Sequence, residues 1–155
     1  MSKKNVLPRA TARLVGRTCL CLHVQRAARA LARRFDEAFR PVGLTNTQFS
    51  LLMALNRPRA PNMRQVSDVL AMDRTTVTAN LKPLERRGLV RVSVDSSDKR
   101  SRRLALTAAG LDLLARVLPA WRRTHDAIER DLAPADPDRL RETLRAMAGR
   151  PENGP

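Results

Sequence analysis

Short polar and cationic side chains recur along one side of the helix that the sequence predicts after Asp73. At about 100° per residue, Val77, Leu81 and Leu84 fall together in a narrow apolar arc. The residues that face away from this arc, or lie in the first turn, are Arg74, Thr75, Thr78, Ala79, Lys82 and Arg86. Arginine can bind guanine through two hydrogen bonds, threonine hydroxyls suit base edges or phosphates, and alanine methyls can contact thymine. These residue types at this spacing predict contact with duplex DNA.

A second basic segment, from Asp95 to Arg103, follows this helix. It joins two short alternating runs, Leu89 to Val94 and Arg103 to Leu106, that predict the strands of a hairpin. A solvated helix face and self-paired surface charges could account for the two basic surfaces separately. The short side chains among the helix cations, and the excess of cations over acids in the loop, favour DNA instead. The loop cations are Lys99, Arg100, Arg102 and Arg103.

Cys19, Cys21 and His23 are the other residues that could react or bind a metal. On one continuous helix, residues two apart point about 200° from each other, so the two thiols could not share an ion. Cys21 and His23 could not form an acid-base pair for the same reason. We therefore expect no catalytic residue, no metal site and no cofactor. The cysteines fit small apolar residues near a helix interface, or a redox site.

The first predicted element is a helix from about Ala10 to Arg40, which ends at Pro41 and Gly43. Its apolar residues recur at steps of three and four: Leu20, Val24, Ala27, Leu31, Phe35 and Ala38. Thr45 can cap the next helix with Gln48 as its capping-box partner. The apolar face expected for that second helix is Phe49, Leu52, Met53 and Leu55.

A helix-turn-helix follows, in which Asn62 caps a short helix and Asp73 caps the next. The short helix is expected to bury Val66, Val69 and Leu70. Thr107 can cap a long helix with a seam of Leu111, Leu114, Leu118, Trp121, His125, Ile128 and Leu132. A final helix is expected from about Asp138 to Met147. Two helices around a tight turn, then a basic hairpin, predict a winged helix-turn-helix whose second helix enters the DNA major groove.

The composition supports a polyanionic partner. The 155 residues contain 30 Lys and Arg against 15 Asp and Glu, a net charge of +15. No segment has the roughly 18 uncharged apolar residues of a membrane helix, and no signal peptide is recognisable, so we expect a cytoplasmic protein without membrane contact. Aromatic residues make up 3% and tyrosine is absent, which disfavours base stacking on a single strand.

These features together resemble the MarR family of winged helix-turn-helix regulators. The resemblance covers roughly residues 12 to 147. It is carried by Leu44-Thr45 with Gln48-Phe49, Asp73-Arg74-Thr75-Thr76-Val77-Thr78, Leu84-Glu85-Arg86-Arg87-Gly88-Leu89-Val90, Asp98-Lys99-Arg100-Ser101 and Leu106-Thr107-Ala108-Ala109-Gly110, in this order. It implies a homodimer, with the first, fifth and sixth predicted helices of both chains interlocked, on a pseudo-palindromic duplex.

The resemblance also implies site residues. Arg100 would enter the minor groove, with Asp98 holding its guanidinium group. The groove and phosphate contacts would be Arg74, Thr75, Thr76, Thr78 and Lys82. The family's usual activity is repression, relieved when a small molecule or an oxidant reaches the region between the dimer helices and the DNA-binding lobes.

Two kinds of effector remain open. An apolar cavity with one or two polar groups would suit a small aromatic acid or a phenol. Its candidate residues are Val24, Arg26, Phe49, Met53, Trp121 and His125. Alternatively, Cys21 lies 24 residues before Thr45, similar to the reactive cysteine of the family's organic-hydroperoxide sensors. Those sensors bind the thiolate through tyrosines, and Gln25 and Phe35 stand in their place here.

The expected fold is mainly α, a winged helix of the α+β type with helices added from both chain ends. The expected divisions are a basic arm at 1–11, a dimerisation region at 12–43 and 107–148, a DNA-binding lobe at 44–106 and a frayed tail at 149–155. An alternative function in another class is an architectural protein that coats DNA through charge alone, without sequence specificity.

Overall fold

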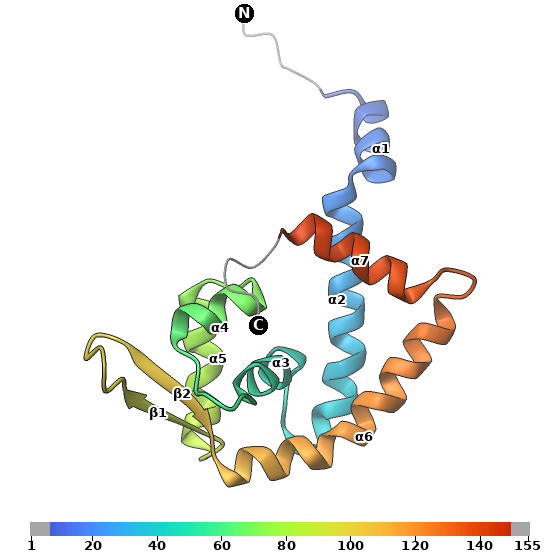
Figure 1. Cartoon of the computed structure of the whole chain (residues 1–155). Coiled ribbons are helices and arrows are strands. Elements are labelled where there is room, and N and C mark those ends of the chain that lie inside the picture. The colour runs from blue at the N-terminus through green and yellow to red at the C-terminus, as the bar shows by residue number, and fades with distance from the viewer. Residues whose placement is uncertain (1–6, 150–155) are drawn as a thin grey trace, which may run out of the picture.

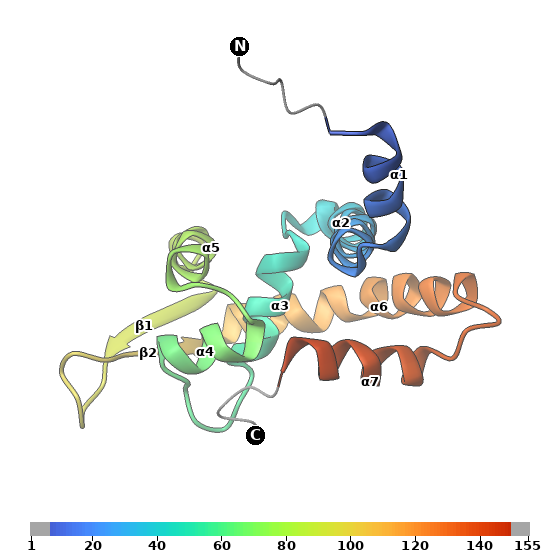
Figure 2. The ribbon, with the colours of Figure 1, turned by 90° about the horizontal axis from the view of Figure 1, so that it is seen from above.

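A computed structural model describes residues 7–149 of the chain. It is mainly helical, with one antiparallel two-stranded sheet, as predicted (Figure 1). The elements are α1 (Arg9–Thr18), α2 (Leu20–Phe39), a 3-10 helix (Arg40–Val42), α3 (Asn46–Leu55), α4 (Met63–Leu70), α5 (Arg74–Arg86), β1 (Val90–Val94), β2 (Arg102–Leu106), α6 (Ala108–Asp131) and α7 (Pro137–Ala148). Helices α3 to α5 and the hairpin form a lobe, from which α1, α2, α6 and α7 extend (Figures 1 and 2).

The helix starts within the lobe are set by local side-chain hydrogen bonds. Thr45 and Gln48 form a complete capping box at the start of α3, and Asn62 and Gln65 form another at the start of α4. Asp73 caps α5. In the turn between α4 and α5, Ala71 adopts a left-handed conformation with φ of 50°. These caps confirm the predicted helix-turn-helix.

The core lies where α5 packs against α3, α4 and β1. Val77, Leu81 and Leu84 of α5 are buried, as predicted. Val90 pairs with Leu106 in the hairpin, and Leu104 of β2 is completely buried. This core holds α5 in place while its opposite side faces outward.

The sequence predicts one helix from about Ala10 to Arg40, and this prediction is wrong because the helix is interrupted at Cys19, between α1 and α2. Cys19 has an extended conformation, with φ of −69° and ψ of 105°, and its sulfur accepts the N–H of Leu22 at 3.5 Å. At the end of α1, the Thr18 hydroxyl donates to the carbonyl of Leu14 at 2.8 Å. Such side-chain bonds to the backbone compete with a continuous helix. Arg9 already belongs to α1, so the predicted basic arm overlaps a helix, and residues 1–6 lie outside the described range.

Several predicted buried faces are also corrected. Val69 and Met53 are 37% and 42% exposed, whereas Ser67 and Leu51 are buried beside them. Helix α3 is buried on several sides, because it contacts α2, α4, α5, α6 and β2. Its buried residues therefore do not form the single apolar stripe that the sequence prediction assumes. Phe39, which the predicted stripe of α2 omits, is completely buried and packs against Phe49 with ring centroids 4.7 Å apart.

The long helix α6 buries a different stripe in its first half than the sequence indicates. Gly110, Leu113, Leu114 and Val117 are buried, whereas Leu111 is 46% exposed. Pro119 lies within α6 and Pro83 within α5, and each helix continues through its proline. The predicted seam therefore does not describe the buried side of the first half of α6.

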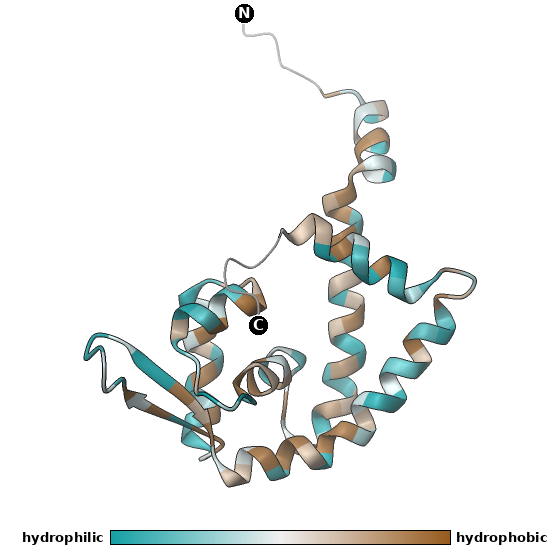
Figure 3. Ribbon diagram, viewed as in Figure 1, coloured by the Kyte–Doolittle hydropathy of each residue, from teal (hydrophilic) through white to brown (hydrophobic). Residues whose placement is uncertain are grey.

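Large apolar side chains are exposed on the helices from both chain ends. In Figure 3 these helices carry hydrophobic residues among hydrophilic ones. The exposed side chains are Leu14 and Val15 on α1, Leu20 and Leu31 on α2, and Leu140, Leu144 and Met147 on α7. Exposed apolar surface of this extent is typical of an interaction site. None of the helices between residues 7 and 149 is long and apolar enough to span a membrane.

Candidate nucleic-acid interface

The outward face of α5 gathers most of the predicted DNA contacts. A surface depression of about 330 Å³ is lined by Arg74, Thr75, Thr78, Ala79 and Lys82. Arg86 is exposed in the last turn of the same helix. Two cations, two hydroxyls and a methyl group therefore share one open surface, which is the chemistry needed at base edges and phosphates.

Thr76 has a different position from the other predicted contacts. Its backbone N–H donates to Asp73 Oδ1 at 2.8 Å, and its hydroxyl donates to Asp73 Oδ2 at 2.7 Å. These bonds, the backbone one foremost, lower the pKa of Asp73 below its ordinary value of 3.8. The hydroxyl proton is thus used in capping α5, and Thr76 retains only acceptor capacity for a second partner.

Arg87 was missed by sequence reasoning, although it connects α5 to a distant segment. Its guanidinium group donates to the carbonyl of Gly43 at 2.7 Å and to that of Val42 at 2.9 Å. Both carbonyls belong to the segment that follows α2. Arg87 therefore attaches the end of the recognition helix to the base of α2, and no local pattern in the sequence indicates this contact.

In the wing, Asp98 contacts the backbone of Arg100, and not the guanidinium group that it was predicted to hold. Asp98 Oδ1 accepts the backbone N–H of Arg100 at 3.0 Å, and no ion pair joins the two side chains in the structure that residues 7–149 form. Arg102 donates to the carbonyl of Lys99 at 3.3 Å, within the same turn. Asp98 thus shapes the wing turn, and the side chains of Lys99 and Arg100 are exposed.

The base of the wing is held by Asp95 and Arg103. The buried Asp95 carboxylate accepts from the backbone and hydroxyl of Ser97 and forms an ion pair with Arg103. Arg103 also donates to the carbonyl of Ala60 at 3.1 Å. The hydrogen bonds from Ser97, followed by Arg103, lower the pKa of Asp95 from 3.8 to about 2. Opposite charges at the two ends of the loop were the only sequence signal for this pair.

Folding stability should therefore depend on Asp95 at acidic pH. A carboxyl whose pKa is lower in the folded state stabilises the fold above its unfolded pKa, and this contribution is lost as pH falls from 3.8 toward about 2. We expect Asp95→Asn to be less stable than the wild type at pH 6, with a difference that shrinks below about pH 4. Denaturant unfolding of both proteins between pH 2 and 6 measures this, and a constant difference would contradict it.

The residues predicted to line an effector cavity are only partly brought together. Trp121 stacks on His125 with ring centroids 4.7 Å apart, and His125 Nε2 lies 3.1 Å from Glu129. Glu129 also pairs with Arg141 of α7 at 2.6 Å. Phe49 belongs to the buried core, Val24 is half-buried, and Arg26 and Met53 are exposed.

The two cysteines lie on either side of the first residue of α2. The Cys21 sulfur accepts from Gln25 Nε2 at 3.2 Å, and Gln25 Oε1 accepts from Arg29 at 3.2 Å. Cys19 is half-buried and Cys21 is exposed. Because Cys19 lies outside the helix, the expected helical separation of the two thiols does not apply.

Comparison with known proteins agrees with this fold and with DNA binding. Residues 42–101 match the model of the MarR family. The chain is 30% identical to the HTH-type transcriptional regulator PecS of Dickeya dadantii over 132 residues, 83% of this chain and 77% of PecS. The Mycobacterium tuberculosis regulator MosR in complex with DNA is 36% identical, with a TM-score of 0.76 over 84% of this chain and 93% of MosR. The repressor CouR on a 23-mer duplex is 31% identical, with a TM-score of 0.75 over 84% of this chain and 92% of CouR. The chain belongs to the MarR family and is a DNA-binding transcriptional regulator.

Proposed function

We propose that this regulator acts in the cytoplasm as a homodimeric repressor of a pseudo-palindromic operator, without catalysing a reaction. Helix α5 would enter the major groove, and the exposed wing cations Lys99 and Arg100 would contact the adjacent minor groove and its phosphates. The observation that carries this proposal is the single depression on α5 lined by Arg74, Thr75, Thr78, Ala79 and Lys82. The net charge of +15 favours the same partner.

Substitutions in α5 and in the wing should differ in effect. Arg74→Ala or Thr75→Ala should relax discrimination at particular base pairs, at about 1 to 3 kcal/mol for a direct base contact. Arg100→Ala should lower the slope of log affinity against log salt by roughly one unit, because one phosphate contact is lost. Operator and scrambled duplexes titrated at several salt concentrations measure both effects. An unchanged slope for Arg100→Ala would exclude this position for the wing.

The architectural alternative has a distinct result in the same experiment. A protein that coats DNA through charge would bind operator and scrambled duplexes with equal affinity at every salt concentration. Footprinting would then show uniform coverage. Protection of a two-fold site, with half-sites about one helical turn apart, supports the repressor.

A small aromatic carboxylate or phenol is the effector that we propose for release from DNA. Trp121 and His125 stack face to face and offer an aromatic surface with ring nitrogens that can form hydrogen bonds, and Val24 and Arg26 lie on the neighbouring helix α2. Among similar structures, CouR from Rhodococcus jostii is bound to p-coumaroyl-CoA, and BpsR of Bordetella bronchiseptica is regulated in DNA binding by 6-hydroxynicotinic acid. An effector acts only if it binds the DNA-incompetent state more tightly.

A thiol switch at Cys21 is the second candidate, favoured by the hydrogen bond from Gln25. Gln25 takes the place of a tyrosine in the family's peroxide sensors, yet it also donates to the cysteine sulfur, at 3.2 Å. Peroxide would oxidise the Cys21 thiol to sulfenic acid and be reduced to water, and Cys19 is a nearby thiol that could then condense to a disulfide.

One experiment separates the two effectors. Trp121 is the single tryptophan, so its fluorescence reports binding of aromatic acids while operator release is followed in parallel. We expect release by an aromatic acid or phenol, with Cys21→Ser behaving as the wild type. Release by peroxide that Cys21→Ser abolishes, without response to aromatic compounds, would establish the thiol switch instead.

A further inference from the structure

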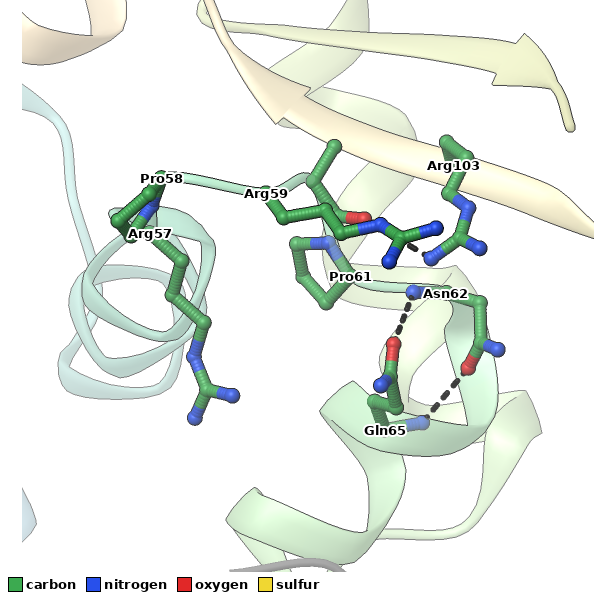
Figure 4. Close-up of a pocket in the computed structure, with 8 residues that line it drawn as sticks. Arg57, Pro58, Arg59, Pro61, Asn62, Gln65 and Arg103 are labelled. Atoms are coloured by element: carbon green, nitrogen blue, oxygen red, sulfur yellow. Dashed lines mark hydrogen bonds between the residues drawn. The ribbon is translucent and has the colours of Figure 1, made fainter. Parts of the chain in front are cut away.

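A basic cavity lies at the loop between α3 and α4, and of the basic residues discussed above only Arg103 lines it. Its volume is about 590 Å³. Arg57 and Arg59 of the loop and Arg103 of β2 line it. Figure 4 shows the Arg59 side chain directed toward Arg103, with the Pro61 ring beside it, whereas the Arg57 side chain points away from these two. The remaining lining residues are Pro58, Ala60, Asn62 and Gln65.

The charges around this cavity are not balanced. Three arginines line it and no acidic residue does. The guanidinium groups of Arg57 and Arg59 have no ion pair or hydrogen bond with any residue between 7 and 149, and both side chains are exposed. Asp95 neutralises only Arg103, from the side of the wing. The cavity therefore keeps an excess of positive charge that an anion would neutralise.

Further hydrogen-bond donors lie at the start of α4. The capping box uses the side-chain oxygens of Asn62 and Gln65, whose amide NH₂ groups take no part in it. The arginine and amide N–H groups can donate hydrogen bonds to the oxygens of an oxyanion such as phosphate. The prolines add a small apolar surface that can contact the rest of a molecule that carries the oxyanion.

The cavity is separated from the recognition helix by the hairpin. Helix α5 packs against β1, whereas the loop is attached to β2 through the hydrogen bond from Leu104 N to Pro61 O at 2.9 Å. Figure 2 shows α5 and this loop on opposite sides of the hairpin. The cavity is nevertheless connected to the wing, because Arg103 contacts both Ala60 and Asp95.

We propose that the Arg57, Arg59 and Arg103 cavity binds a phosphate group. One planar guanidinium group can donate two parallel hydrogen bonds to a phosphate. Arg57 and Arg59, which have no ion-pair partner among residues 7–149, together carry two positive charges, equal in size to the charge of a doubly ionised phosphate. The phosphate could belong to the DNA backbone or to a free phosphorylated small molecule. In both cases Arg103 would join the bound phosphate to the base of the wing. This site and its test are independent of the aromatic effector.

The test uses the full-length chain with Arg57→Ala and Arg59→Ala combined. Arg122→Ala with Arg123→Ala on α6 is the matched control, since both residues are exposed and the charge change is the same. Calorimetry with inorganic pyrophosphate measures the free-phosphate source. The salt dependence of operator binding measures the DNA source, with unfolding curves as a check that both variants fold.

If the source is a free phosphate, pyrophosphate should bind the loop variant at least tenfold more weakly than the control, at an equal operator salt slope. If the source is the DNA backbone, the salt slope of the loop variant should fall below that of the control by roughly one to two units, because up to two phosphate contacts are lost. Pyrophosphate affinity and salt slope that both equal the control would overturn the proposal.

Discussion

Replacing Leu140 and Leu144 by glutamate should convert the protein to a monomer and weaken operator binding at least a hundredfold. Both side chains are exposed on α7, in the same set as the apolar residues of α1 and α2. MarR regulators act as dimers, so a second chain is the expected cover for this surface. A monomer loses the second half-site, and linked binding contributes about 10² to 10⁴ in affinity.

Arg145→Glu is the matched control for this prediction. At about 100° per residue, Arg145 lies away from both leucines around α7, about 100° from Leu144 and about 140° from Leu140, and its substitution also lowers the net charge by two units. Analytical ultracentrifugation and operator titration of both variants measure the effect. We expect the control to stay dimeric and to lose only a modest, salt-sensitive part of its affinity. A double leucine variant that remains dimeric would show that α7 lies outside the interface.

Gly110→Ala in the first turn of α6 should lower the free energy of unfolding by about 3 kcal/mol or more. A Cβ at this position would overlap the carbonyl oxygen of Leu89 and lie 3.2 Å from Leu106 Cδ2. Leu89 cannot move away freely, because its carbonyl accepts the N–H of Thr107 at 3.1 Å. The start of α6 would have to separate from the hairpin.

Gly16→Ala provides the comparison for this substitution. Gly16 lies within α1, and no atom lies within 4 Å of the Cβ it would gain. We expect it to stabilise α1 by up to about 1 kcal/mol, because alanine has the higher helix propensity. Denaturant unfolding of the two variants measures both values. Equal stability of Gly110→Ala and the wild type would mean that Gly110 and the Leu89 carbonyl do not approach as closely as described.

Much of the lobe could be predicted because its boundaries depend on short-range hydrogen bonds. Each cap could be predicted from a few neighbouring residues, because the capping side chain accepts the backbone N–H of the residue three positions further along. These caps are Thr45, Asn62, Asp73 and Thr107. The outward face of α5 could be predicted equally well, because helical periodicity alone decides which of its side chains point the same way.

The roles of individual side chains in the wing were harder to predict from the sequence. Asp98 was expected to hold the guanidinium group of Arg100, but its carboxylate accepts the backbone N–H of that residue. Acidic side chains in tight turns have both options, and sequence spacing does not distinguish them. The break at Cys19 has a similar origin, since its sulfur replaces a helical hydrogen bond at a position that periodicity treats as continuous.

The amino-acid sequence was sufficient to predict the order of the elements from α3 to α7, the caps of α3 to α6, the outward face of α5 and the basic character of the wing. Tertiary structure alone decided that Phe39 is buried, that Val69 is exposed, and that the core side of α6 runs through Leu113 and Val117. It also decided the contacts of Arg87 with Val42 and of Arg103 with Ala60, which join residues 45 and 43 positions apart. Caps and periodicity follow from bonds within one helical turn, whereas burial and these arginine contacts depend on segments that meet only after the chain has folded.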